Sequence, residues 1–98
     1  FAVFNLSISY SSDVSLALRL MHDVGEELQN DEAFRPFMLD DTEIVGVDKL
    51  SDAAVVLKGR IKTLPGKQWS VQREYLKRIK LAFDPAGILN PGKIFDLT

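Results

Sequence analysis

Hydrophobic and polar side chains alternate near the start of the chain, over the run VFNLSISY at positions 3–10. A period of two in aromatic and β-branched residues is typical of a strand with one buried face. The segment is therefore predicted to be a half-buried strand. Its expected inward-facing positions are Phe4, Leu6, Ile8 and Tyr10.

The hydrophobic period lengthens to three or four residues after Asp13, which, like Ser12, is a candidate helix cap. Either side chain can accept hydrogen bonds from the free N–H groups of a first helical turn. Apolar residues then recur along one face, which predicts an amphipathic helix from Val14 to about Asn30. Gly25 inside this helix costs about 1 kcal/mol relative to alanine, so we expect close packing there.

A hairpin is predicted in the middle of the chain, after a polar connection at residues 31–41. The segments 42–50 and 53–63 have the composition and alternation of strands, and Ser51 and Asp52 join them. Such a short polar link between two strands indicates antiparallel pairing. One face of the second strand is expected to hold Val55, Leu57, Gly59 and Ile61.

Helical periodicity returns at Trp69 and continues to Phe83, and the pattern predicts that Pro85 and Gly87 end this second helix. Its predicted apolar stripe holds Trp69, Leu76, Ile79 and Phe83.

The predicted order is strand, helix, strand, strand, helix and a short last strand. This order indicates an α+β fold, the ferredoxin-like βαββαβ sandwich, with an antiparallel sheet and two helices on one face. Residues 1–88 would form this domain. Residues 89–98 would form a C-terminal tail or an edge strand, because Pro91 cannot donate a hydrogen bond to a sheet.

Composition limits the class of protein. A chain of 98 residues with 46% hydrophobic residues fits one domain. Cysteine is absent, which excludes disulfides and cysteine-based metal sites. No segment approaches the ~20 consecutive apolar residues that span a bilayer. Because the first residue is Phe1 rather than methionine, we expect the chain to be a piece of a longer protein.

The small net charge of −2 conceals a separation of acidic and basic residues. Residues 22–52 hold ten acidic side chains and two basic ones, whereas residues 58–80 hold eight basic side chains and one acidic one. Two interpretations remain open. The two faces attract each other within one fold, or the basic stripe meets anions or an acidic surface on a partner.

The loop KTLPGKQW, at residues 62–69, is the first candidate for chemistry. A phosphate-binding loop needs a glycine, four residues, and then Gly-Lys followed by Ser or Thr. Here Gln68 follows the lysine, and Ile61 stands where the first glycine would be. We therefore expect Pro65 and Gly66 to turn the chain between strand and helix rather than to bind phosphate.

Other reactive side chains also lack the expected partners. His22 is the only histidine, and Asp23 beside it is expected to face another way on the helix. The carboxylates Asp40, Asp41 and Glu43 lack the spacing of a calcium loop. The sequence therefore predicts no catalytic residue, no metal site and no cofactor.

The second helix could in principle bind nucleic acid, because it combines basic side chains with aromatic ones. Its candidates are Arg73, Lys77, Arg78 and Lys80, with Trp69 and Tyr75 available for stacking. Small domains of this fold bind RNA through aromatic residues on central strands, and the predicted strand at 53–63 has none. We therefore expect no nucleic-acid partner.

Residues 45–88 resemble the C-terminal cytoplasmic domain of small-conductance mechanosensitive ion channels, the MscS family. The matching run is VGVDKLSDAAVVLKGRIKTLPGKQWSVQREYLKRIKLAFDPAGI, and similar positions earlier in the chain extend the resemblance to about residues 3–88. The matches include Gly46, Asp52, Arg60, Thr63, Pro65, Gly66, Gln68, Trp69, Arg73, Glu74, Arg78, Phe83, Asp84 and Gly87.

The resemblance implies a non-catalytic role in a membrane protein. Chains of this family form homoheptamers whose transmembrane helices open a pore under membrane tension, for example during osmotic stress. This domain would then help to build the vestibule on the cytoplasmic side of the bacterial inner membrane. By this analogy Pro65 and Gly66 form the strand-to-helix joint, and Trp69 anchors the helix to the sheet or to a neighbouring subunit. Our hypothesis is that Arg73 and Lys77 lie at a subunit interface.

The end of the chain departs from that family. Residues 82–95, AFDPAGILNPGKIF, instead resemble the C-terminal end of FAD-linked oxidases of the glycolate and D-lactate type. The alternative interpretation is therefore a C-terminal fragment of such an oxidase. The two interpretations differ in what precedes the chain, namely transmembrane helices or a large FAD-binding domain.

Overall fold

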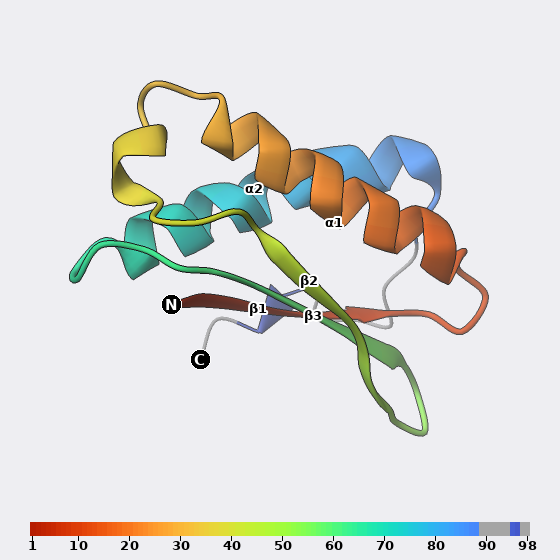
Figure 1. Cartoon of the computed structure of the whole chain (residues 1–98). Helices are drawn as coiled ribbons and strands as arrows, with labels where there is room; N and C mark the ends of the chain where they lie inside the picture. The colour runs from red at the N-terminus through yellow and green to blue at the C-terminus, as the bar shows by residue number, and fades with distance from the viewer. Residues whose placement is uncertain (89–94, 97–98) are drawn as a thin grey trace.

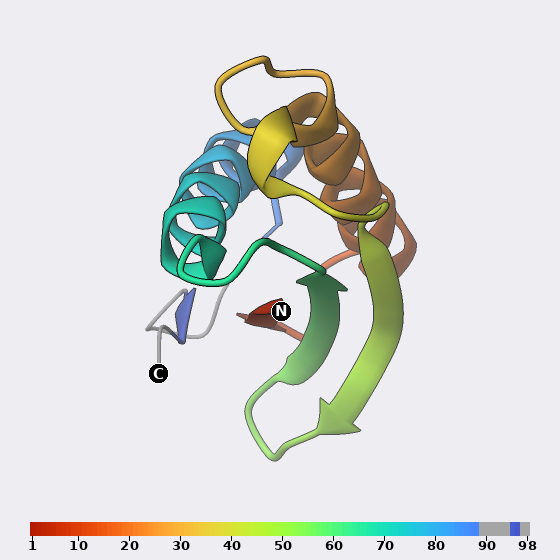
Figure 2. The same cartoon turned by 60° about the vertical axis from the view of Figure 1, so that its left-hand side comes forward.

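The computed structural model describes residues 1–88 and 95–96. Its elements, in chain order, are the strand β1 (Ala2–Ile8), the helix α1 (Val14–Gln29), the short 3₁₀ helix η1 (Arg35–Phe37), the strands β2 (Glu43–Leu50) and β3 (Val55–Ile61), the helix α2 (Gln68–Ala86) and the strand β4 (Phe95–Asp96). The four strands form one antiparallel sheet in the order β2-β3-β1-β4. Both helices cover the same face of this sheet (Figures 1 and 2). The predicted α+β, ferredoxin-like arrangement is confirmed.

The core lies between the sheet and the two helices, and β1 lies at its centre. Alternate residues of β1 are buried, as the sequence pattern predicts. Phe4 of β1 stacks on Tyr75 of α2 with ring centroids 3.9 Å apart. The Tyr75 hydroxyl donates a hydrogen bond to the Met21 carbonyl of α1 at 2.9 Å, so one side chain connects both helices and the sheet. Burial raises the pKa of Tyr75, which keeps this hydroxyl a donor.

The helix α1 begins and packs as its sequence indicates. The backbone N–H of Leu16 donates to the Asp13 carboxylate at 3.0 Å, which confirms Asp13 as the cap. Gly25 faces Thr42, and a Cβ on that glycine would lie 2.4 Å from the Thr42 Oγ1. The predicted close packing at Gly25 is therefore confirmed, and its partner is the residue just before β2.

The helix α2 continues farther than predicted. It includes Pro85 in its last turn and ends at Gly87, whose φ of 74° is left-handed. The N–H groups of Gly87 and Ile88 donate back to the carbonyls of Asp84 and Phe83, which satisfies two carbonyls at the helix end. Gly87 is thus the stop, as predicted. The prediction that Pro85 ends the helix was wrong, because packing of Phe83 and Ile88 in the core holds the last turn in place.

Two aromatic side chains that continue the predicted apolar faces are exposed. The strand β1 ends at Ile8, and a turn follows in which the Ser12 N–H donates to the Ser9 carbonyl. Tyr10 therefore lies past the sheet and is 52% exposed. Trp69 is 58% exposed, so it does not belong to the buried stripe of α2. That stripe instead contains Val71, Tyr75, Leu76, Ile79 and Phe83.

The end of the chain is described only in part. Phe95 pairs with Leu6 and Asp96 pairs with Asn5, so β4 lies at the edge of the sheet next to β1. The remainder of the predicted tail, residues 89–94 and 97–98, lies outside the described residues. None of the helices in the described part of the chain is both long enough and apolar enough to cross a membrane.

Candidate functional site

The loop KTLPGKQW between β3 and α2 forms a tight joint. The Lys67 N–H donates to the Leu64 carbonyl at 3.1 Å, and Gly66 has a φ of 83°. Proline followed by a left-handed glycine is the signature of a type II turn. The Leu64 N–H also donates to the Phe37 carbonyl at 2.9 Å, which fastens the loop to η1. The geometry is that of a structural turn between strand and helix.

Arg78 of α2 joins the segment 31–37 to the helix. Its guanidinium donates to the carboxylates of Asp31 and of Glu74, the latter at 2.8 Å, and lies 5.8 Å from the centre of the Phe34 ring. The hydrogen bond from Arg78 lowers the pKa of Asp31, and the hydrogen bond to Glu74 raises the pKa of Arg78. This junction was not predicted, although Glu74 and Arg78 have the i,i+4 spacing of a helical ion pair.

A groove lies beside this junction, between α2 and the segment 33–37. We call it the basic groove, and its lining residues are Ala33, Phe34, Phe37, Ser70, Arg73, Glu74 and Lys77. Arg73 and Lys77 are one helical turn apart and exposed, and neither forms an ion pair with any described residue. The Lys67 ammonium adds a further positive charge beside the groove, 4.8 Å from the centre of the Phe37 ring. Glu74, which also lines the groove, is paired with Arg78, so the groove combines aromatic walls with two unpaired cations.

The structure brings Arg73 and Lys77 together but places Trp69 elsewhere. Trp69 borders a separate hollow that it shares with Phe1 and the start of β1. In this hollow the Gln72 amide donates to the Val3 carbonyl at 2.7 Å. More than half of the surface of Trp69 is therefore exposed to solvent, at the place where α2 meets the sheet.

Part of the charge separation is used inside the fold. Arg60 of β3 pairs with Glu43 of β2, and Arg78 pairs with Asp31. Both ion pairs connect the acidic segment 22–52 with the basic segment 58–80. The internal interpretation therefore accounts for some of the basic side chains. The basic groove holds two of those that form no ion pair with a described residue, Arg73 and Lys77.

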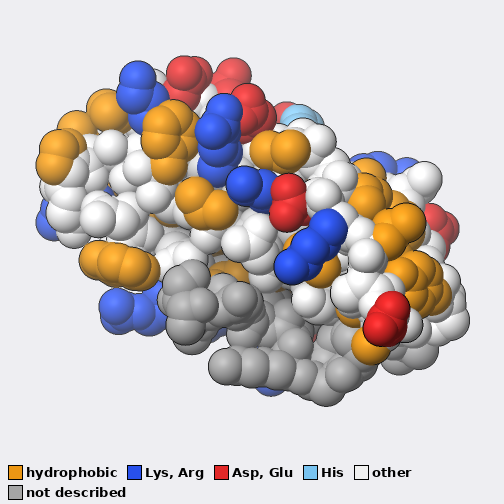
Figure 3. Space-filling view, turned by 90° about the horizontal axis from the view of Figure 1, so that it is seen from below, with side chains coloured by type: hydrophobic (Ala, Val, Ile, Leu, Met, Phe, Trp, Pro, Cys, Tyr) orange, Lys and Arg blue, Asp and Glu red, His pale blue; other side chains and the backbone are white. Residues whose placement is uncertain are grey.

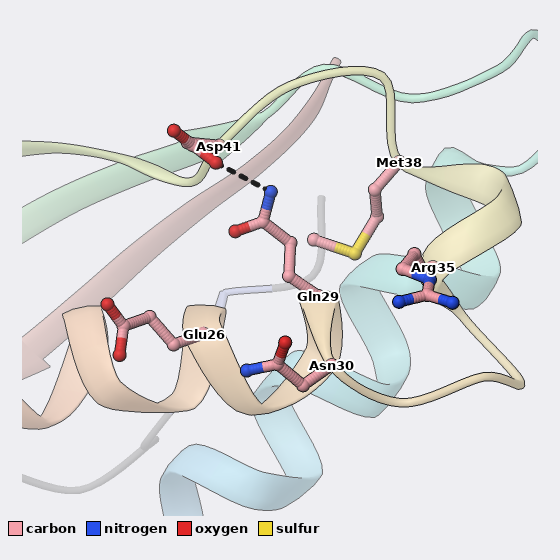
Figure 4. Close-up of a pocket in the computed structure, with 6 residues that line it drawn as sticks. All are labelled: Glu26, Gln29, Asn30, Arg35, Met38 and Asp41. Carbon is pink, nitrogen blue, oxygen red and sulfur yellow. Dashed lines mark hydrogen bonds between the residues drawn. The ribbon is translucent and has the colours of Figure 1, made fainter.

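A polar pocket lies at the C-terminal end of α1 (Figure 4). Its lining residues are Glu26, Gln29, Asn30, Arg35, Met38 and Asp41. The Gln29 amide donates to the Asp41 carboxylate at 2.8 Å, so the pair ties α1 to the segment before β2. The lining contains no hydroxyl or thiol beside a general base, which is the arrangement that nucleophilic catalysis requires.

His22 lies near two carboxylates, which was not predicted. Its Nδ1 lies 3.7 Å from a carboxylate oxygen of Asp23, and its Nε2 lies 3.6 Å from one of Glu26. The prediction that Asp23 faces another way was therefore wrong, because both side chains lean over the same exposed turn. These three residues could contribute ligands to a metal ion, but all of them are exposed, and a cluster of this kind is common on helix surfaces without a metal.

Comparison with known proteins agrees with the fold. The family described as "Mechanosensitive ion channel MscS, C-terminal" matches residues 2–89. The chain is 28% identical over 95 residues to the moderate conductance mechanosensitive channel YbiO of Escherichia coli, covering 97% of this chain and 13% of that protein. It is 26% identical over 90 residues to the small-conductance mechanosensitive channel of Caldanaerobacter subterraneus subsp. tengcongensis, covering 92% of this chain and 31% of that protein.

These matches do not favour the alternative of an oxidase fragment. The oxidase-like run begins at residue 82, inside the segment that matches the channel family, and six of its residues, 89–94, lie outside the described structure. The chain spans less than a third of the length of either channel that it resembles. It belongs to the MscS family of mechanosensitive ion channels, as the C-terminal domain of such a protein.

Proposed function

We propose that this chain is the non-catalytic domain that builds the cytoplasmic vestibule of a mechanosensitive channel and helps its subunits to assemble. The family match over residues 2–89 carries this proposal, together with the channel names of both relatives. The whole protein would lie in the bacterial inner membrane, with this domain on the cytoplasmic side. Its partners would be other copies of the same subunit, and the whole assembly would contain seven copies. No nucleic acid or cofactor would be needed.

The packing of the domain supports a role in construction. Tyr75 connects two helices and the sheet, Arg78 fastens the segment 31–37, and the turn at Pro65 and Gly66 fixes the start of α2. The first contact lies in the core and the other two lie nearer the surface, and each holds one element against another. A vestibule wall needs such a rigid body, because neighbouring subunits must meet with the same surfaces in every copy.

The exposed residues support contacts with neighbours. Arg73 and Lys77 would act at a subunit interface, and Trp69 would anchor α2 to an adjacent surface, since 58% of its side chain is free here. Residues 1–88 would form the domain itself. The tail 89–98 would add the edge strand that begins with Phe95.

The first experiment tests the location and the assembly of the full-length channel that carries this chain. Because this segment contains no cysteine, Lys80→Cys introduces a unique thiol in it, on the exposed side of α2, once other cysteines of the channel are replaced. A membrane-impermeant maleimide should label this thiol in inside-out vesicles and not in right-side-out vesicles. Labelling from the outside would contradict the cytoplasmic location.

Assembly and function are then measured on the same protein. Native mass spectrometry of the purified channel should give seven subunits, and a lower or mixed number would contradict the heptamer. In bacteria that lack their own mechanosensitive channels, the intact protein should raise survival of a sudden fall in osmolarity. A channel deleted for residues 1–98 should lose that protection or fail to assemble.

A further inference from the structure

The turn between β2 and β3 projects away from the helices and carries exposed apolar and acidic side chains (Figures 1 and 2). We call it the hairpin tip and define it as residues 47–52, all of which are exposed. Asp48 and Asp52 outnumber the single cation Lys49, so the hairpin tip carries a net charge of −1. Val47 is 47% exposed and Leu50 is 68% exposed. Asp48 and Asp52 are also exposed, and neither forms an ion pair with any described residue. Seen from below, hydrophobic side chains gather toward this end of the molecule (Figure 3).

The hairpin tip is held in one conformation before any partner binds. The Ser51 N–H donates to the Ala54 carbonyl at 2.9 Å, and the Ala54 N–H donates to the Ser51 hydroxyl oxygen at 3.0 Å. The Tyr10 hydroxyl donates to the Ser51 carbonyl from the turn before α1. A surface that is already ordered loses little conformational entropy on binding, so exposed apolar groups on it favour a specific contact.

The free edge of β2 is poorly suited to strand addition. Its pairing with β3 is interrupted between Ile44 and Gly46 and again between Val47 and Lys49. Such bulges break the regular row of N–H and C=O groups that an added strand would need. A partner of the hairpin tip must therefore recognise side chains. These include two aliphatic groups, Val47 and Leu50, and two carboxylates, with the ammonium group of Lys49 between them in the chain.

The basic groove presents the opposite chemistry. Phe34 and Phe37 meet edge to face with ring centroids 6.5 Å apart, and the exposed cations Arg73 and Lys77 lie beside them. Aliphatic side chains pack on aromatic walls, and carboxylates pair with unpaired cations. The groove thus offers aromatic walls and a net positive charge to a second molecule. The hairpin tip offers aliphatic side chains and a net negative charge.

The two surfaces lie at opposite ends of the domain. In both views of the ribbon, the β2–β3 turn is far from η1 and the start of α2, which border the basic groove (Figures 1 and 2). One molecule therefore cannot bring its own tip into its own groove. Two copies related by a two-fold axis through the groove would place like charges together. A head-to-tail contact avoids this repulsion and propagates into a ring when the rotation closes.

We propose that the hairpin tip of one copy docks into the basic groove of the next copy, with Asp48 and Asp52 facing Arg73 and Lys77. This inference rests on the proposed assembly function and names the surfaces that perform it. The apolar pair Val47 and Leu50 would pack against the aromatic walls of the groove. The occupant is a second copy of this chain, because the complementary charges are both exposed on the same molecule.

Charge exchange in the full-length channel tests the contact. The double reversal Arg73→Glu with Lys77→Glu should weaken association by at least about tenfold, because like charges then face each other. Asp48→Lys with Asp52→Lys should weaken it similarly. The channel that carries all four substitutions should recover the assembly of the unchanged protein, and that recovery also shows that each reversed surface folds.

Matched control reversals use exposed charges outside both surfaces. Lys80→Glu lies on α2 but outside the basic groove, and Glu27→Lys lies on α1. Both controls should leave assembly unchanged. Native mass spectrometry at graded detergent concentration measures the loss of subunits. If the unchanged channel is monomeric, the proposed assembly function fails. If it assembles and the reversals behave like the controls, only the tip-to-groove contact is refuted.

Cross-linking identifies the occupant directly. A channel with cysteine in place of Ser70 in the groove and of Asp52 at the tip should give a ladder of linked subunits with a short bifunctional maleimide. The control pair replaces Ser70 and Asp23, and it should give no ladder. A link formed within one chain, or to a different protein, would show another occupant and would overturn the proposal.

Discussion

Replacing Gly25 with alanine tests how closely α1 packs against the chain before β2. A Cβ at this position would lie 2.4 Å from the Thr42 Oγ1, 2.7 Å from its Cβ and 2.9 Å from its Cγ2. All three distances are shorter than any ordinary contact between heavy atoms of this kind. A rotation of the Thr42 side chain can move Oγ1 and Cγ2, but its Cβ is fixed to the backbone. The substitution therefore forces the helix and the strand apart.

Two opposing effects set the size of the expected change. Alanine in place of glycine stabilises the middle of a helix by about 1 kcal/mol. Overpacking a tight contact costs about 1–3 kcal/mol. With Thr42 Cβ unable to move aside, the steric cost should lie in the upper part of that range, so Gly25→Ala should lower the free energy of unfolding by about 1–2 kcal/mol. For a domain of this size, that corresponds to a fall in Tm of about 5–15 °C.

Urea denaturation of residues 1–98, followed by helical circular dichroism, measures this free energy. A double-mutant cycle with Thr42→Gly isolates the contact, because that change removes all three clashing atoms. Gly25→Ala should then cost much less, or become stabilising, in the Thr42→Gly background. If Gly25→Ala alone raises stability by about the helix-propensity value, the close contact between α1 and Thr42 does not exist in solution.

Three further substitutions test single interactions in the same denaturation assay. Tyr75→Phe removes the hydrogen bond to the Met21 carbonyl and should cost about 1 kcal/mol, and an unchanged free energy of unfolding would show that the bond contributes nothing. Gly66→Ala forces a side chain into a left-handed turn with φ of 83° and should cost about 1–2 kcal/mol, whereas a stabilised variant would contradict this turn geometry. Arg78 lowers the pKa of Asp31 below its usual value of 3.8, so this carboxylate stabilises the fold above that pH, and the contribution is lost as the pH falls through the lower, folded pKa. Asp31→Asn should therefore make stability fall less steeply between pH 4 and pH 2, and an identical slope would refute the role of the ion pair.

The periodicity of the sequence was enough to predict the helices, the central strands and their order. The alternation around Phe4 and the three-to-four spacing after Val14 follow directly from which side of each element faces the core. Local chemistry also sufficed for the cap at Asp13 and the stop at Gly87, because caps depend on residues within one turn of the helix end. The family could be inferred for a similar reason, since the resemblance lies in a continuous run of residues.

The errors came from features that neighbouring residues do not determine. Tyr10 and Trp69 continue the apolar patterns of β1 and α2. Tyr10 lies past the end of β1 and Trp69 lies in the first turn of α2, and both are exposed. Periodicity gives the direction in which a side chain points and does not give the extent of the element that would cover it. The end of α2 also depends on tertiary packing. Phe83 and Ile88 are buried, and their packing holds the last turn of the helix in place around Pro85.

The sequence by itself determined the class of fold, the order of its elements and the family, because each depends on residues close together in the chain. The tertiary structure alone decided which charges are paired and which remain free. Arg78 meets Asp31 across 47 positions, and Arg60 meets Glu43 across 17, whereas Arg73 and Lys77 find no partner among the described residues. Charges act through space rather than along the chain, so only the folded arrangement separates those that stabilise the domain from those that remain available to another subunit.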